Sequence, residues 1–599
     1  MNTHQRSSDF SAHDPRFLHP WDWFEWQVVK HPDRIAVISS LHKVTYRELL
    51  EQSISLAVCI QQRLTENSKT KHLAICICCQ REYCVPVAIL ACLRAGVPWV
   101  PVDPDQPQSR IQAILLDSGC QVALTDQKNQ QKFEDLNCEC ILLDTPDKNK
   151  KGGVQSTFSP SLFAYVIYTS GSTGIPKGVL IRNDCLCRLI AVNTMQLHEG
   201  DKVLQFASIS FDLSIFEIFN TLLLGCTLVL ATEKLRQAPQ KLQTLLKREA
   251  VNVMAVTPSV LTLLKPELPS LNRLIIVAEK CSESLLNKWL PDRRIFNLYG
   301  PTETTMCATG TEYHPGLSPY NIGRPLPHIK TWVVDSDDKP VAPGLTGELY
   351  IGGRCLAEKY VNQPELTRER FKLLHTGQNS YEKVYCTGDL VKLLEDGSME
   401  IQGRTDFQEK VLGHRIEPGE IEQQLLSHPA ITLAVVKSVN EHHHKTLAAF
   451  YTLSALDNHP SPAPGDLLNF LRQQLPPYMI PSHFIAMENM PLTINGKVDR
   501  KALTLPSRKE IQLATETALT SIQEQLLTIC SKILKDNTLT LQNDFFTSGG
   551  NSIRAAQLVM AMQQQFHCAV TLNRLYNLKS LAELAQWIED QNEVTHEVI

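Results

Sequence analysis

Short apolar runs alternate with stretches of helical periodicity over roughly the first two thirds of the chain. Residues 162–168 form one such run, β-branched and aromatic, and predict a buried strand. Similar runs at 203–208, 227–231 and 251–256 predict further strands, and residues 85–95 predict a helix. This alternation of strand and helix predicts a parallel α/β sheet.

The pattern changes twice further along the chain. Short runs broken by Gly and Pro over 323–353 predict a small β-barrel or sandwich, and after residue 404 the pattern becomes that of a smaller α+β unit. Beyond residue 514 the chain is helical, and Ser580 with Glu583 caps a last helix that runs to Ile588. We predict an α/β protein with four parts: a disordered N-terminus at 1–20, a large domain with α/β sheets and a small β-barrel at 21–404, an α+β domain at 405–507, and a four-helix bundle at 514–595.

Composition narrows the classes of function. A chain of 599 residues is too long for one core, and a net charge of −5 without a basic stripe argues against a nucleic-acid partner. The longest apolar run, 221–231, is too short to span a membrane, and the N-terminus lacks a secretory signal. We therefore expect a cytoplasmic protein whose 18 cysteines are free thiols.

A loop rich in glycine and hydroxyl side chains follows the strand at 162–168. It reads Thr-Ser-Gly-Ser-Thr-Gly-Ile-Pro-Lys-Gly from Thr169 to Gly178. Gly171 and Gly174 allow the backbone to approach a ligand closely, the hydroxyl groups donate to oxyanions, and Lys177 adds a positive charge. The spacing is not that of a Walker A loop, so the loop predicts a phosphate site of another kind.

The full string resembles the AMP-forming, adenylate-forming superfamily, which includes acyl-CoA synthetases, luciferases and the adenylation domains of nonribosomal peptide synthetases. The resemblance implies that ATP and Mg²⁺ are used. It also implies that the loop clamps the β- and γ-phosphates of ATP through Thr169, Ser170, Gly171, Ser172, Thr173, Gly174 and Lys177.

Other segments resemble the remaining nucleotide motifs of that superfamily. From Asn-Leu-Tyr-Gly-Pro-Thr-Glu, the resemblance places adenine against Asn297, Tyr299 and Gly300, phosphate against Thr302, and magnesium on Glu303. From later motifs, the resemblance implies that Asp389 binds the ribose hydroxyls and that Arg404 contacts the nucleotide. It also implies that Asp406 is a hinge residue and that Lys497 is the catalytic lysine, which stabilises charge as it develops in the reaction.

Asp212 is a carboxylate inside the apolar segment Phe-Asp-Leu-Ser-Ile-Phe, where burial requires a cationic partner. In the peptide synthetase adenylation domains that this segment resembles, the matching aspartate binds the substrate α-ammonium. The same resemblance gives an otherwise apolar lining, which predicts an apolar amino acid, proline first and then valine, leucine or isoleucine. The lining residues are Leu213, Phe216, Ala255, Ile275, Val277, Leu298, Met306 and Cys307.

The segment Gly549-Gly-Asn-Ser552 resembles the carrier domains of peptide synthetases, in which 4′-phosphopantetheine is esterified to the serine. Two glycines expose Ser552 at a predicted helix N-terminus, which favours a phosphate group. Four residues depart from the patterns of the family: Ala278, Cys386, Leu412 and Asn551.

Together these motifs predict an adenylation domain fused to a peptidyl carrier, a loading or stand-alone module that forms aminoacyl-AMP and passes the acyl group to phosphopantetheine on Ser552. Expected partners are the amino acid, a phosphopantetheinyl transferase, and synthetase or tailoring enzymes acting in trans. Two alternatives stay open. One is an acyl or aryl-acid ligase of the same superfamily, disfavoured by Asp212, and the other is a catalytically silent amino-acid-binding scaffold, disfavoured by Lys497, Asp389 and Glu303.

Overall fold

The computed structural model describes most of the chain. The described residues are 19–66, 74–136, 138–144, 160–171, 176–236, 238–377, 380–411, 413–441, 444–453, 462–491, 498–505, 519–534, 536, 539–546, 548, 550, 552–566, 568, 570, 574–575, 578, 580 and 581–596. They divide into two compact units, the first ending at Asp406 and the second containing Phe407 onward. Residues 170–175 and 237–239 are grouped with the second unit.

The first unit is built on a large mixed sheet whose centre is parallel. The strands run in the order β16-β17-β20-β21-β15-β14-β13-β12-β11-β9-β10-β1-β2, with β19 paired to β20. The predicted strands at 203–208, 227–231 and 251–256 are present with shorter bounds. The central and N-terminal strands are β1 (Ile35–Ile38), β2 (Lys43–Thr45), β9 (Lys202–Gln205), β10 (Thr227–Leu230), β11 (Val253–Val256), β12 (Arg273–Ile276) and β13 (Arg294–Tyr299).

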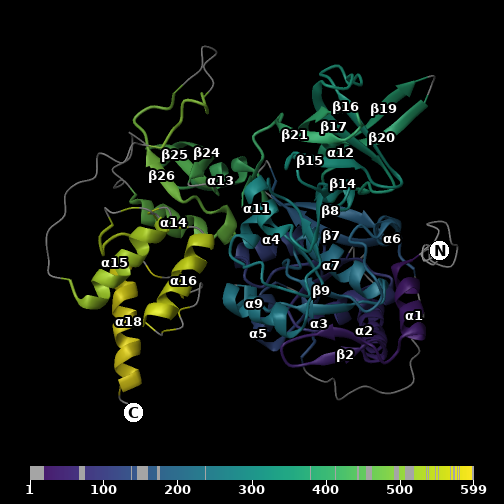
Figure 1. Ribbon diagram of the computed structural model, residues 1–599, viewed down its shortest axis with the longest axis horizontal. Helices are drawn as coiled ribbons and strands as arrows, with labels where there is room; N and C mark the ends of the chain where they lie inside the picture. The colour runs from purple at the N-terminus through teal and green to yellow at the C-terminus, as the bar shows by residue number, and fades with distance from the viewer. Residues whose placement is uncertain are drawn as a thin grey trace. The chain divides into compact units, whose positions relative to one another are not determined.

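The predicted small β-barrel region corresponds to the antiparallel strands that extend this sheet past β13, at the upper right of Figure 1. The long strand β20 carries Asp389 and pairs with β21, which carries Arg404, so that these two residues face each other in register. The strands are β14 (Thr309–Tyr313), β15 (Asn321–Pro325), β16 (Ile329–Val334), β17 (Thr346–Gly353), β19 (Phe371–Gly377), β20 (Ser380–Leu393) and β21 (Met399–Arg404).

A second sheet of the first unit carries the glycine-rich loop. Its order is β18-β8-β7-β4-β3-β5-β6, parallel except where β7 meets β8 and β8 meets β18. The predicted strand at 162–168 is β7, displaced by one residue. The strands are β3 (Ile75–Cys78), β4 (Trp99–Pro101), β5 (Val122–Thr125), β6 (Glu139–Leu142), β7 (Phe163–Thr169), β8 (Lys177–Arg182) and β18 (Lys359–Tyr360).

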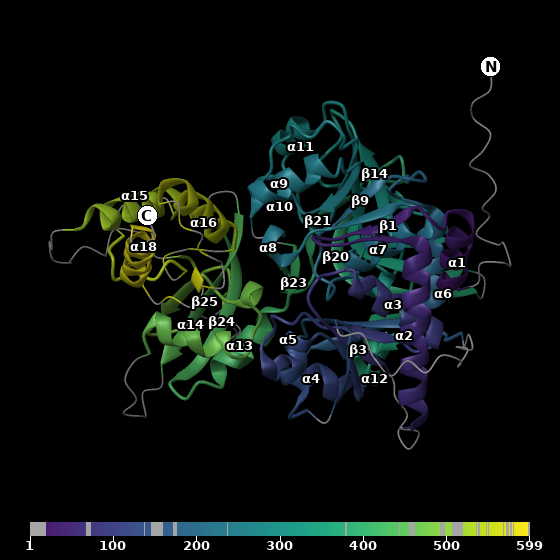
Figure 2. The same cartoon turned by 90° about the horizontal axis from the view of Figure 1, so that it is seen from below.

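Helices of the first unit pack their apolar faces against these sheets, and Figure 2 shows α3 beside β3. The largest hydrophobic cluster takes side chains from both sheets and from α1, α2, α3, α6 and α7. The helices are α1 (Pro20–Lys30), α2 (Tyr46–Glu66), α3 (Cys84–Ala95), α4 (Gln108–Ser118), α5 (Gln127–Gln130), α6 (Asn183–Val192), α7 (Asp212–Leu223), α8 (Glu233–Arg236), α9 (Pro239–Arg248), α10 (Pro258–Leu261), α11 (Glu283–Trp289), α12 (Pro364–Arg370) and the 3-10 turns η1 (Gln131–Phe133) and η2 (Thr302–Thr304).

The second unit begins with the predicted α+β region. A three-stranded sheet in the order β24-β25-β26 packs on α13 and α14, and β22 pairs with β23. The elements are β22 (Glu409–Val411), β23 (His414–Ile416), α13 (Pro418–Leu426), β24 (Ile431–Glu441), β25 (His444–Leu453), α14 (Pro464–Arg472), η3 (Pro477–Met479) and β26 (His483–Ala486).

The C-terminal part of the second unit is helical, as predicted, with a core of its own. The described helices there are α15 (Ser521–Leu534), α16 (Ser552–Phe566) and α18 (Leu581–His596). The Ser580 hydroxyl accepts from the Glu583 amide, which confirms the predicted cap, but α18 continues well past Ile588. The apolar periodicity weakens there, while the charged residues remain compatible with a helix.

The structure also describes two features that the composition singled out, the cysteines and any helices able to span a membrane. The cysteines are free thiols, and most are buried. In the ranges that the structure describes, no helix combines the length and apolar character needed to cross a membrane.

Glu217, on helix α7, gives the fold a pH dependence. Its carboxylate is buried and accepts from the amides of Phe206 and Ala207, yet burial outweighs these donors and raises its pKa to about 8, from an ordinary 4.5. The protonated carboxyl therefore makes its full contribution to the free energy of unfolding below the ordinary pKa of 4.5. This contribution is lost as the pH rises from there toward 8, at about 1.4 kcal/mol per pH unit. We expect Glu217→Gln to remove this slope in urea unfolding between pH 5 and 8; parallel curves for both proteins would contradict it.

Candidate active site

The glycine-rich loop connects two paired strands. Thr169 at the end of β7 lies opposite Lys177 at the start of β8, so this pair ends the antiparallel ladder of the two strands. Gly178 is required just beyond it, because a Cβ atom there would lie 2.9 Å from the Tyr168 ring. The predicted phosphate ligands Ser172, Thr173 and Gly174 lie outside the described residues.

The beginning of the loop already binds an anionic group. Within the second unit, the Gly171 amide donates to a carboxylate oxygen of Glu420 at 3.1 Å, and the Ser170 hydroxyl donates to the Arg415 carbonyl at 2.8 Å. A carboxylate thus occupies a backbone N–H that the sequence analysis assigns to a phosphate. This contact supports an anion-binding role for the loop.

Lys177 and Glu303 form a buried ion pair in the first unit. The Lys177 ammonium lies 3.8 Å from the Glu303 carboxylate, and the Tyr360 hydroxyl donates to the same carboxylate at 2.7 Å. Glu303 is fully buried and Lys177 is 6% exposed. Magnesium is usually held by one or two carboxylates together with substrate phosphates, so the buried Glu303 oxygens fit the predicted metal.

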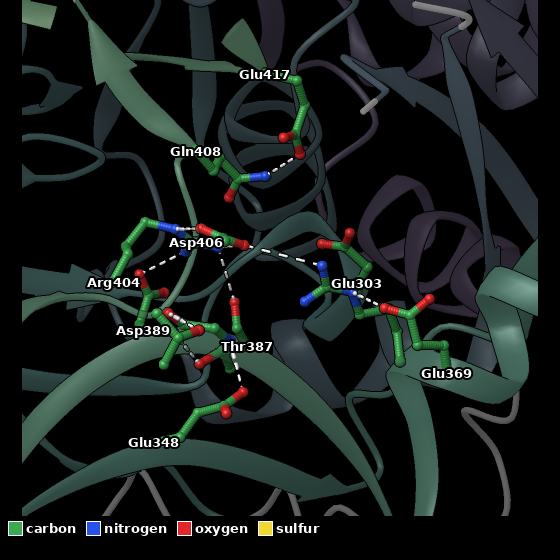
Figure 3. A network of polar contacts seen from close by, with 12 residues as sticks. Glu303, Glu348, Glu369, Thr387, Asp389, Arg404, Asp406, Gln408 and Glu417 are labelled. Atoms are coloured by element: carbon green, nitrogen blue, oxygen red, sulfur yellow. Dashed lines mark hydrogen bonds and ion pairs between the residues drawn. The ribbon is translucent and has the colours of Figure 1, made fainter. Parts of the chain in front are cut away.

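Asp389 belongs to the polar network that Figure 3 shows. One of its oxygens accepts from the Tyr299 hydroxyl at 2.5 Å, and the other accepts from Arg404 at 2.6 Å. Burial and the neighbouring Asp389 raise the pKa of Tyr299 well above its usual value, so the hydroxyl remains a donor. Arg404 also donates to both oxygens of the predicted hinge residue Asp406, at 2.7 and 2.9 Å. One guanidinium therefore joins the predicted ribose ligand to the predicted hinge.

Asp212 begins helix α7, where the helix N-terminus favours a negative charge. Its carboxylate accepts from the Thr302 hydroxyl at 2.7 Å. The structure therefore joins two predicted site residues that are 90 positions apart in sequence. Thr302, predicted to meet a phosphate, lies beside the predicted ammonium site.

The predicted lining of the substrate pocket forms one apolar cluster. Seven of these residues are buried in it, and Leu213 packs against it partly buried; the seven are Phe216, Ala255, Ile275, Val277, Leu298, Met306 and Cys307. Behind this cluster, the buried Arg188 of α6 donates to the Cys307 carbonyl at 3.1 Å. The structure thus brings together all the apolar residues that the sequence analysis assigned to the pocket.

Two glycines and an asparagine support the site locally. A Cβ atom on Gly300 would lie 2.3 Å from the Met306 carbonyl, so only glycine fits where this turn meets the pocket wall. Asn297, on β13, donates to the Asn321 carbonyl at 2.7 Å, which fixes the orientation of its side-chain amide. In the second unit, a Cβ atom on Gly550 would lie 2.5 Å from Phe545, next to the carrier motif.

Lys497, Asn551 and Leu412 lie outside the described residues. Ser552 is the first residue of α16, a 15-residue helix, which agrees with its predicted place at a helix N-terminus. That position suits the phosphate end of phosphopantetheine, because unpaired helical N–H groups and the helix dipole favour an anion there.

Ala278 adopts a strained backbone conformation, with φ of +67°. A left-handed conformation costs a residue with a Cβ atom about 1 kcal/mol, which glycine avoids. We expect Ala278→Gly to raise the free energy of unfolding by about 0.5–1 kcal/mol. As matched controls, Ala250→Gly, where φ is +52°, should give a similar gain, and Ala113→Gly inside α4 should give a loss. Destabilisation by Ala278→Gly would contradict this account.

Two residues in or beside the site were not predicted from the sequence. Tyr360 lies in a two-residue strand and carries no motif, so its bond to Glu303 had no sequence signal. Arg370 belongs to the charged run Thr-Arg-Glu-Arg that ends α12 and has the pattern of a solvated helix face. The aromatic Phe371 that follows it was the one hint of a buried environment.

Comparison with protein families divides the chain in the same order as the motifs. Residues 24–361 match the AMP-binding enzyme family, 420–497 match the AMP-binding enzyme C-terminal domain, and 524–588 match the phosphopantetheine attachment site. The chain belongs to the AMP-binding enzyme family. It therefore combines an AMP-binding enzyme domain and its C-terminal domain with a phosphopantetheine attachment site.

Two of the similar curated proteins are bacitracin synthase 3 and tyrocidine synthase 1. The chain is 36% identical over 571 residues to bacitracin synthase 3 of Bacillus licheniformis, which covers 94% of this chain and 9% of that protein. It is 34% identical over 581 residues to tyrocidine synthase 1 of Brevibacillus parabrevis, covering 94% of this chain and 52% of that protein. This AMP-binding enzyme therefore spans about a tenth of the length of bacitracin synthase 3 and about half of the length of tyrocidine synthase 1.

Two solved structures of nonribosomal peptide synthetases align with this chain. An artificially fused adenylation and carrier di-domain from Klebsiella oxytoca aligns with a TM-score of 0.69 at 27% identity, covering 78% of this chain and 93% of that one. A four-domain nonribosomal peptide synthetase bound to AMP and glycine aligns with a TM-score of 0.59 at 29% identity, covering 97% and 43%. The predicted fold class, a large α/β domain followed by a smaller domain and a carrier, is confirmed.

Proposed function

We propose that this AMP-binding enzyme activates an apolar amino acid and loads it on its own carrier domain. The observation that carries the proposal is the position of Asp212, a carboxylate at the N-terminus of α7 bonded to Thr302 and adjoining an apolar cluster. An ammonium beside Asp212 and an apolar side chain in the cluster satisfy both environments. Proline is the first candidate, followed by valine, leucine and isoleucine.

In the first half reaction, a carboxylate oxygen of the amino acid attacks the α-phosphorus of ATP and pyrophosphate leaves. Asp389 takes the ribose hydroxyls, Asn297 and Tyr299 hold adenine, and Lys497 stabilises the charge that develops on the carboxylate and α-phosphate. Glu303 would hold magnesium, which supplies charge neutralisation on the phosphates. Because Tyr299 and Arg404 already donate to Asp389, ribose binding requires that these bonds be shared or exchanged.

In the second half reaction, the thiol of phosphopantetheine on Ser552 attacks the aminoacyl carbonyl and AMP leaves. Rotation at Asp406 would exchange the groups presented to the adenylate, and Asp406 begins this motion bound to Arg404. A phosphopantetheinyl transferase is the required modifying partner. Enzymes that extend or modify the loaded amino acid are the further partners that this function implies.

Amino-acid-dependent pyrophosphate exchange over a panel of amino acids tests the substrate class. We expect the highest rates with proline or branched aliphatic amino acids, because the eight side chains assigned to the lining are apolar. A clear preference for a charged amino acid would overturn the apolar assignment. Exchange with simple carboxylic acids would favour the acyl or aryl-acid ligase, and no exchange at all would favour the silent scaffold.

Ser552→Ala tests the carrier assignment separately. We expect this variant to retain pyrophosphate exchange, since adenylation does not use the thiol, and to lose the mass shift that phosphopantetheine gives on treatment with the transferase. Ser548→Ala, a hydroxyl change in the same segment, is the matched control that should keep both properties. Persisting modification of the Ser552→Ala protein would show that the attachment serine is elsewhere.

A further inference from the structure

Arg370, the last residue of α12, lies beside the tyrosine that contacts the buried ion pair of Lys177 and Glu303. The helix is joined to β18 by the Tyr360 amide, which donates to the Thr367 hydroxyl at 3.1 Å. Arg370 lies three residues after Thr367 and therefore on the same helix face. Phe371, the next residue, packs its ring 5.7 Å from that of Tyr360 and 5.2 Å from that of Tyr385, measured between ring centres. Tyr360 in turn donates to Glu303.

In the described part of the chain, the guanidinium has only long contacts with carboxylates. It lies 3.5 Å from Glu369, its neighbour in the helix, and 3.8 Å from Asp406, two ion pairs drawn in Figure 3. Asp406 has a closer partner in Arg404, which donates to both of its oxygens. Among the described residues, none accepts a hydrogen bond of normal length from Arg370, although its side chain is only 30% exposed.

The surroundings of Arg370 suit a polyanion. Lys177 lies 5.3 Å from the centre of the Tyr360 ring, so one buried and one partly exposed cation are placed around the same tyrosine. Guanidinium groups bind phosphate through two parallel N–H donors, a geometry that the present carboxylate contacts of Arg370 do not use. The partial exposure of Arg370 leaves it open to a ligand that enters from solvent.

We propose that Arg370 is a further catalytic residue, which binds the pyrophosphate released when the adenylate forms. This inference rests on the proposed adenylating function. In that step the carboxylate oxygen forms a bond to the α-phosphorus, and the bond from the α-phosphorus to the bridging oxygen of pyrophosphate breaks. The electron pair leaves with pyrophosphate, and no proton is transferred. Arg370 donates to the pyrophosphate oxygens as their negative charge grows, and Asp406 stays paired with Arg404.

Inorganic pyrophosphate, with magnesium present, is the direct probe. We expect Arg370→Met in the full chain to weaken pyrophosphate binding tenfold or more, and Arg370→Lys to recover part of the loss because it restores charge without the bidentate geometry. Arg368→Met is the matched control, since Arg368 lies on the same helix with 77% of its side chain exposed, and its affinity should equal that of the wild type. An affinity of Arg370→Met within twofold of the wild type would overturn the proposal.

A second measurement separates this role from a purely structural role at the hinge. In Arg370→Met, we expect the KM for pyrophosphate in the exchange reaction to rise while the KM for the amino acid is unchanged. Transfer of a preformed aminoacyl-adenylate to the carrier should keep its wild-type rate, because that step involves no pyrophosphate. Slowed transfer with unchanged pyrophosphate affinity would assign Arg370 to the hinge and contradict the proposal. Absence of amino-acid exchange in the wild type would refute the proposed function but leave the binding test valid.

Discussion

Lys497→Ala is expected to lower the rate of aminoacyl-adenylate formation about 100- to 1000-fold. Removal of one preorganised charge that acts in the transition state typically costs that much. The amino-acid KM should change far less, because Asp212 and the apolar cluster provide most of the ground-state binding. Pre-steady-state formation of the adenylate, with the amino acid selected in the exchange panel, measures the effect.

The matched control for this variant is Lys501→Ala, four residues further along, at an exposed position. It should have wild-type kinetics. Transfer of a preformed aminoacyl-adenylate to the carrier should be nearly unchanged in Lys497→Ala, because the lysine acts in the first half reaction. An equal loss in both half reactions would contradict the assigned role and indicate general damage to the second unit.

Asp212→Asn is expected to raise the amino-acid KM about 30- to 1000-fold. The change keeps the shape of the side chain and an oxygen acceptor for the Thr302 hydroxyl, but removes the charge that pairs with the ammonium. Loss of one partner of a buried charge pair costs about 2 to 4 kcal/mol, which corresponds to that range of affinity. Pyrophosphate exchange as a function of amino-acid concentration gives the KM.

The deaminated analogue of the preferred amino acid is the informative second substrate. The wild type should discriminate strongly against it, and Asp212→Asn should lose most of that discrimination. Asp184→Asn, at the exposed start of α6, is the matched control and should keep it. Equal use of the amino acid and its analogue by the wild type would contradict recognition of the ammonium and support the acyl-ligase alternative.

Local motifs predicted the parts of the site that lie in continuous segments. Thr169 and Lys177 are paired across the loop that the glycine and hydroxyl pattern singled out, and Asp212 stands at a helix start where a carboxylate is stabilised. The apolar lining residues, assigned one by one from the resemblance, form a single cluster. These features were predictable because each depends on neighbouring residues or on a motif whose match assigns each residue its place in the site.

Contacts between distant segments were not predictable in the same way. Lys177 was assigned to a phosphate clamp, but in the structure it pairs with Glu303, since only the fold places β8 beside the η2 turn. The strain at Ala278 could be suspected from the missing glycine, yet its positive φ is a property of the folded loop. Arg370 resembled an ordinary surface charge because the aromatic residues around it come from other strands.

Mass spectrometry of the intact protein tests the central claim most directly. The phosphopantetheine-bearing chain is incubated with ATP, magnesium and the amino-acid panel, and its mass is compared with that of the Ser552→Ala chain. The account predicts an added mass equal to one apolar aminoacyl group, present only with ATP, absent from Ser552→Ala and removed by thioester cleavage. A phosphopantetheine-bearing wild-type chain that acquires no aminoacyl mass, or acquires it equally in the Ser552→Ala variant, would contradict the account.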